Sequence, residues 1–161
     1  THLRPDLGET HNNLGTALSA KGRLDEAIKE FAEACRVTPH VPAIHVNLAN
    51  ALAAAGRFGE AAAKYRELLA HAPQNAALWN NYAVSLYKQG EKQESAEAFR
   101  KALALDPNLK DAREGLAVAL GEKPEPAPPQ PPPGDQVPMS LPQSPTLGAP
   151  PSAGPASPLF P

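Results

Sequence analysis

Apolar residues recur along this chain with a helical period inside each segment and a 34-residue period between segments. Leu14 and Leu18 are four positions apart, which places both on one face of a helix. The same pair returns one period later as Leu48 and Leu52. Leu86 and Leu120 continue the series that Leu18 and Leu52 begin, and Tyr82 and Leu116 continue that of Leu14 and Leu48. Two further sets match at the same interval, Ala27, Ala61 and Ser95, and Phe31, Tyr65 and Phe99. A fixed period of this length is the sequence signature of a stacked repeat array.

Small residues and helix-ending residues follow the same period. Gly22, Gly56 and Gly90 can supply the left-handed backbone that ends a helix. One proline closes each unit, at Pro39, Pro73 and Pro107. A further position is kept small, which favours close approach of a partner helix, at Gly15, Ala49, Ala83 and Ala117. The pattern predicts an all-α chain with helices over residues 9–21, 25–37, 42–55, 59–71, 76–89, 93–105 and 109–121.

Each unit closely resembles the tetratricopeptide repeat, in which a Leu-Gly pair and an aromatic residue are followed by Ala, Phe and Pro within one repeat. The resemblance is carried by segments such as Asn12-Asn13-Leu14-Gly15 and Trp79-Asn80-Asn81-Tyr82-Ala83, together with the turn glycines and the closing prolines. It implies a right-handed α-solenoid of helix-turn-helix repeats. Three full units are expected, followed by a capping helix.

The period also sets the expected boundaries. They are 1–7 for the end of a preceding repeat, 8–41, 42–75 and 76–109 for the three repeats, 110–123 for the cap and 124–161 for a tail. Pro5 precedes Pro39 by one full period, so we infer that the chain is cut from a longer array, which the upstream coding sequence would test. In the cap, Leu116, Ala117 and Leu120 are expected to face the array, with charged residues on the outer side.

Composition separates the tail from the repeats. Of the 20 prolines, 15 lie between Pro124 and Pro161, where Glu125 and Asp135 are the only charged residues. Such a segment buries too little apolar surface to fold, so we expect a disordered, proline-rich tail. Residues 123–129 also fit a basic residue followed by a Pro-x-x-Pro ligand for an aromatic-lined groove, although a plain spacer is the preferred interpretation.

Charge and residue types exclude several function classes. The repeats hold all 15 Lys and Arg and 15 of the 17 acidic residues, so their net charge is about zero and no nucleic-acid partner is expected. No apolar run is long enough to span a membrane. His11 and His45 share the position of Trp79 and are expected to pack between repeats rather than bind metal. Cys35 lies on an apolar helix face, where a buried thiol is expected. We expect no catalytic residue and no cofactor, and a cytoplasmic segment is the preferred interpretation.

The candidate binding surface follows from the resemblance, which implies that the first helix of each unit lines a concave groove. The residues expected there are Asn12, Asn13, Thr16, Asn47, Asn50, Asn80, Asn81, Tyr87 and Lys88. Asn13, Asn47 and Asn81 recur once per period, which is similar to the asparagine ladder of the O-linked N-acetylglucosamine transferase superhelix. A side-chain amide both donates and accepts, so each Asn could pair with a peptide backbone. The alternative is that these residues serve solubility or local hydrogen bonding.

The predicted function is a protein-interaction module that binds an extended peptide or a partner helix. The alternative is the C-terminal repeat region of a larger enzyme, such as a glycosyltransferase, that recruits its protein substrate. Repeats that grip the carboxylates of chaperone tails use basic residues, and these are missing here around Ala77 and Asn81. A co-chaperone of that kind is therefore not expected, and the oligomeric state is left open.

Overall fold

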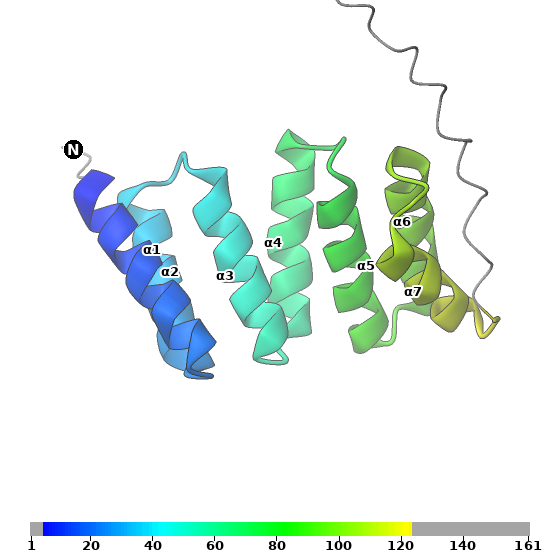
Figure 1. Ribbon diagram of the computed structural model, residues 1–161, viewed down its shortest axis with the longest axis horizontal. Coiled ribbons are helices and arrows are strands. Elements are labelled where there is room, and N and C mark those ends of the chain that lie inside the picture. Colours follow the sequence, from blue (N-terminus) through cyan, green and yellow to red (C-terminus); the bar gives the residue numbers. More distant parts are fainter. Residues whose placement is uncertain (1–4, 124–161) are drawn as a thin grey trace, which may run out of the picture. The chain divides into compact units, whose positions relative to one another are not determined.

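The computed structural model describes residues 5–123, with side chains from Leu7 onward. The expectations for residues 1–4 and for the proline-rich tail at 124–161 lie outside this range. Seven helices and no strand occur in the described residues, which confirms the all-α prediction (Figure 1). They are α1 (Pro5–Ala20), α2 (Leu24–Val37), α3 (Pro42–Ala54), α4 (Phe58–His71), α5 (Ala76–Gln89), α6 (Lys92–Leu105) and α7 (Lys110–Leu120).

The seven helices stack in chain order. Each helix packs against the next one, and α1 also contacts α3 while α5 contacts α7 (Figure 1). The odd-numbered helices therefore lie beside one another on one side of each antiparallel pair. This arrangement is the expected α-solenoid of helix-turn-helix units.

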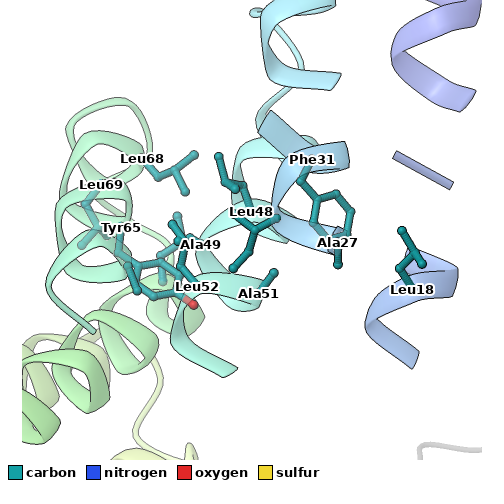
Figure 2. Packing of buried hydrophobic residues seen from close by; sticks show 13 residues of the cluster. Leu18, Ala27, Phe31, Leu48, Ala49, Ala51, Leu52, Tyr65, Leu68 and Leu69 are labelled. Atoms are coloured by element: carbon teal, nitrogen blue, oxygen red, sulfur yellow. The ribbon is translucent and has the colours of Figure 1, made fainter. Parts of the chain in front are cut away.

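Small residues let the two helices of each pair approach closely. A Cβ atom at Gly15 of α1 would lie 2.9 Å from Cδ1 of Phe31 on α2, so only glycine fits there. The equivalent Ala49 and Ala83 are fully buried. Figure 2 shows the resulting core, in which Leu48, Ala49 and Leu52 of α3 lie between the side chains of α2 and those of α4.

The turns use the residues that the period indicated. Gly22, Gly56 and Gly90 have φ of 75°, 77° and 95°, a region in which glycine carries no steric penalty. Ser95 stands where the other units have Ala and is fully buried. Its hydroxyl donates a 2.8 Å hydrogen bond to the carbonyl oxygen of Ala83, which satisfies the polar group.

Two expectations about the ends of the array are corrected, the start of α1 and the burial of Leu120, and Leu14 differs from its equivalent Leu48. Helix α1 begins at Pro5, earlier than expected, because a helix tolerates proline in its first turn, where the N–H has no intrahelical partner. Leu14 is 47% exposed, because the buried Leu48 packs on the preceding pair and no such pair precedes α1 within residues 5–123. Leu120 is 42% exposed, because Leu52 and Leu86 pack on the second helix of their own unit and none follows α7 in that range.

Candidate functional site

Asparagine side chains on neighbouring first helices are hydrogen-bonded to one another. The Nδ2 of Asn47 on α3 donates a 2.9 Å hydrogen bond to Oδ1 of Asn12 on α1. This bond leaves Oδ1 of Asn47 and Nδ2 of Asn12 without a partner among the described residues. Both side chains are half-buried, so each amide is oriented by its neighbour while its second polar end stays available.

A second pair joins α3 to α5. Oδ1 of Asn50 accepts a 2.6 Å hydrogen bond from the hydroxyl of Tyr65 and a weaker 3.4 Å bond from Nδ2 of Asn81. Tyr65 is 1% exposed, and its burial raises the pKa of the phenol to about 12. The hydroxyl therefore stays protonated at neutral pH and acts as a permanent donor. Asn50 is exposed, and its Nδ2 is the polar group that points away from these two bonds.

The space between α1, α2 and α3 forms a small cavity on this face. Its volume is about 290 Å³, and its walls are Thr16, Ser19, Ala20, Phe31, Asn47, Asn50 and Ala51. The cavity brings together three of the residues that the sequence indicated, Thr16, Asn47 and Asn50. Phe31, one of the aromatic residues that recur with the repeat, adds an apolar wall. We call Asn12, Thr16, Asn47, Asn50 and Asn81 the asparagine surface.

The three asparagines that recur with the repeat do not have equivalent surroundings. Asn13 is exposed, and its amide has no hydrogen-bond partner among the described residues. Asn47 and Asn81 are half-buried, and each bonds to an Asn of the preceding first helix. The partner differs because Asn47 bonds to Asn12, 35 residues earlier, whereas Asn81 bonds to Asn50, 31 residues earlier. A regular ladder of identical rungs is therefore not what the described side chains form.

Asn80 corrects the expectation of an exposed groove residue, since only 9% of it is exposed. Its Nδ2 reaches Oδ1 of Asn81 at 3.4 Å, while its own Oδ1 is buried without a partner. The equivalent Asn12 bonds to the residue 35 positions later, and that position after Asn80 is Gly115. Gly115 has no side chain to offer, because a Cβ there would overlap with the ring of Phe99.

The last two residues expected in the groove lie apart from the asparagine surface. Tyr87 is partly buried and packs against the C-terminal cluster formed by residues of α4 to α7, among them Leu86 and Phe99. Lys88 is exposed near the end of α5. Neither residue lines the 290 Å³ cavity.

The position shared by His45, Trp79 and Arg113 has a role that the sequence analysis missed. His45 Nε2 lies 3.0 Å from the carbonyl oxygen of Pro39, and Trp79 Nε1 lies 2.8 Å from that of Pro73. Arg113 donates to the carbonyl of Pro107 in the same way. These side chains bond to the loop that closes the preceding unit, so His45 lies between two repeats as expected. The available signal was that all three carry an N–H group at the same spacing after the closing proline.

The remaining reactive side chains support structure. His11 Nδ1 lies 2.7 Å from Oε2 of Glu30 on α2. Within the part of the chain that the structure describes, no cluster of His, Cys, Asp and Glu could hold a metal ion. Cys35 is half-buried, and burial raises the pKa of its thiol, which disfavours the thiolate that a nucleophile needs. None of the described helices is both long and apolar enough to cross a membrane.

Comparison with known families gives one match. The family described as tetratricopeptide repeat matches residues 12–75 and again residues 46–110. Together these ranges cover more than half of the chain. A search of curated protein sequences found no match.

Solved structures share the fold at low sequence identity. The first tetratricopeptide repeat domain of Spaghetti (RPAP3), solved bound to an HSP90 peptide, has a TM-score of 0.69 and 18% identity, covering 74% of this chain and 95% of that one. The Arabidopsis OM64 domain has a TM-score of 0.67 and 19% identity over 73% and 97% of the two chains. The Sgt2 domain of Aspergillus fumigatus has a TM-score of 0.64 and 20% identity over 71% and 77%.

Proposed function

The chain belongs to the tetratricopeptide repeat family, and from that premise we propose that its asparagine surface binds the backbone of an extended peptide. Repeats of this kind are protein-interaction modules that present a surface built from consecutive units. The neighbour solved with an HSP90 peptide is an example of peptide binding on this fold. The basic side chains that would grip a chaperone tail are absent at Ala77 and Asn81, so this chain needs a different recognition chemistry.

The carrying observation is the bond between Asn12 and Asn47 beside the cavity that holds Thr16 and Asn50. Each of these amides uses one polar end within the protein and keeps the other end for a ligand. A peptide backbone offers an N–H and a C=O at every residue, which complements the free Oδ1 of Asn47 and the free Nδ2 of Asn12. Because neighbouring bonds already fix the amides, little side-chain entropy is lost on binding.

The arrangement favours recognition of the backbone over recognition of side chains. Amides carry no net charge, and the surface contains no Lys or Arg that would select an acidic peptide. Thr16 lines the cavity, and its hydroxyl already donates to the carbonyl oxygen of Asn12 on its own helix. We therefore assign the contacts to Asn12, Asn47 and Asn50, with Asn81 holding Asn50 in place.

The test uses short peptides selected against the full chain from a random display library, with affinity measured by fluorescence anisotropy. Asn47→Ala is expected to weaken binding about five- to tenfold, the effect of one or more lost hydrogen bonds. Asn108→Ala is the matched control, because this exposed Asn lies in the loop between α6 and α7 and should leave affinity unchanged. Equal affinity of both variants and the wild type would remove the asparagine surface from the binding site.

A further inference from the structure

A second cavity lies between α3 and α4, on residues that the asparagine surface does not use. Its volume is about 530 Å³, within the range of about 300–1,000 Å³ that ligand pockets occupy. Its apolar walls come from three helices and their ends, namely Pro42 and Val46 of α3, Leu68 and Ala72 of α4, and Leu78 of α5. It is partly enclosed, so a side chain from another molecule could enter from solvent.

Comparison with the first repeat explains why the middle repeat is open. Leu68 stands where the flanking repeats have the fully buried Ala34 and Ala102, so the middle repeat has a larger side chain at this position, in the wall of the cavity. In the first repeat the helix ends touch, because a Cβ atom at Gly8 would overlap with Cγ2 of Thr38. The middle repeat has Pro42 and Ala72 at these two positions. The middle repeat thus combines the larger Leu68 in the interior with the smaller Ala72 at the helix end, and the cavity lies beside both residues.

The third repeat shows what fills the equivalent place. It carries Trp79 where the middle repeat has His45, and Leu109 where the middle repeat has Asn75, and both side chains pack against the C-terminal cluster. The Nζ atom of Lys101 lies 4.5 Å from the centre of the Trp79 ring, a cation–π contact. An aromatic ring beside a cation is therefore the chemistry that closes this position within the same chain.

The polar rim of the middle cavity is basic apart from one paired acid. The titratable groups that line it are His40, His45, Lys64, Glu67 and His71. Lys64 and Glu67 form an ion pair with 2.8 Å between Nζ and Oε2, so their charges largely cancel. Each imidazole carries a ring N–H, and those of His40 and His71 can donate to a carboxylate placed at the rim.

We propose that this cavity accepts an aromatic side chain of a protein partner, with an acidic residue of that partner at the histidine rim. The ring occupies the volume that Trp79 fills in the third repeat and contacts Val46, Leu68 and Leu78. The carboxylate accepts from the ring N–H groups of His40 and His71, while His45 keeps its Nε2–H on the carbonyl oxygen of Pro39. The cavity shares no residue with the asparagine surface, so a negative result for one proposal leaves the other proposal unaffected.

The experiment titrates the isotope-labelled full chain with the peptide acetyl-Asp-Trp-Asp-amide and follows amide resonances by NMR. Shifts are expected at Val46, Leu68 and Ala72, which line the cavity or lie at its edge. Acetyl-Asp-Ala-Asp-amide should shift none of these resonances, and acetyl-Lys-Trp-Lys-amide should bind at least about threefold more weakly than the Asp peptide, because it offers no carboxylate to the imidazole N–H groups. Absence of shifts at the cavity with the Trp peptide, or equal shifts with the Ala peptide, overturns the proposal.

Two variants that fill or narrow the cavity complete the test. The double substitution His45→Trp with Glu67→Lys copies the Trp79–Lys101 contact into the middle repeat and should abolish binding of the Trp peptide. Ala72→Thr copies Thr38, whose hydroxyl donates to the carbonyl of Ala34, and narrows the same cavity with a smaller change. If either variant folds and still binds the Trp peptide as tightly as the wild type does, the peptide occupies another site and the proposal is overturned.

Discussion

The indole Nε1 of Trp79 donates a 2.8 Å hydrogen bond to the carbonyl oxygen of Pro73, the residue that closes the preceding unit. His45 lies at the same distance along the chain from Pro39, and its Nε2 is 3.0 Å from that carbonyl. Because these side chains lie in the first turn of α3 and α5, each bond ties a loop to the start of the following helix. The connection between units is thereby fixed by side chains as well as by helix packing.

We predict that removing this single N–H weakens the array. Replacing Trp79 with benzothienylalanine, which keeps the ring shape but has no N–H, should lower the free energy of unfolding by about 1 kcal/mol. Urea denaturation of the full chain measures the change. No loss of stability would mean that water replaces the bond to Pro73 at no net cost.

Two glycines within helices should respond in opposite directions to alanine. Gly115→Ala should destabilise the chain by about 1–3 kcal/mol, because its Cβ would overlap with the ring of Phe99 in the core. Gly59→Ala is the matched control, because its nearest neighbour is Gln89 Oε1 at 3.4 Å, at the flexible end of an exposed side chain. That substitution should stabilise the chain by about 0.5–1 kcal/mol. Denaturation midpoints that move in the same direction for both variants would contradict this account of the α6–α7 packing.

The raised pKa of Tyr65 predicts a loss of stability in alkaline solution. Its phenol has a pKa of about 12 in the folded chain, above the ordinary value of about 10 for an unfolded one. The folded state therefore holds the proton longer, so the contribution of Tyr65 to stability is complete below pH 10 and declines as the pH rises toward 12. Tyr65→Phe lacks this decline. Thermal unfolding between pH 9 and 11 should show a shallower fall for the variant than for the wild type, and parallel curves would refute the assignment.

The 34-residue period predicted the helix bounds well from α2 onward. The bounds of α2 to α7 agree with the expectation within one residue, since glycine turns and closing prolines mark them. The exception is Leu120, whose equivalents Leu18, Leu52 and Leu86 are buried in units that have a second helix, which α7 lacks within residues 5–123. A period describes an average unit, so it cannot show that a position at the end of the described array has lost its partner.

The candidate site was only partly predictable for a similar reason. The sequence indicated Thr16, Asn47 and Asn50, which the structure brings to one cavity. It missed the burial of Asn80, because the exposure of a position depends on the neighbouring helices and differs between Asn80 and its half-buried equivalent Asn12. Pairings such as Asn12 with Asn47 depend on which side chains meet between helices, and the alignment of the repeats alone does not specify them.

The asparagine pairs should contribute little to stability, which keeps their effect on binding separable. Asn12 and Asn47 are half-buried, so water can replace their bond, and Asn47→Ala should cost about 1 kcal/mol or less of the free energy of unfolding. Circular dichroism during thermal unfolding checks this expectation. A loss of several kcal/mol would show that the bond is mainly structural.

The central claim is that the asparagine surface recognises a peptide backbone, and backbone N-methylation tests it most directly. A peptide selected against the full chain is compared with a copy that is N-methylated at alternate residues and with a copy in shuffled order. The account predicts that methylation weakens binding at least about tenfold, because each methyl group removes an N–H donor, while shuffling changes affinity by only about two- to threefold. Methylation without effect, together with loss of binding on shuffling, would contradict it.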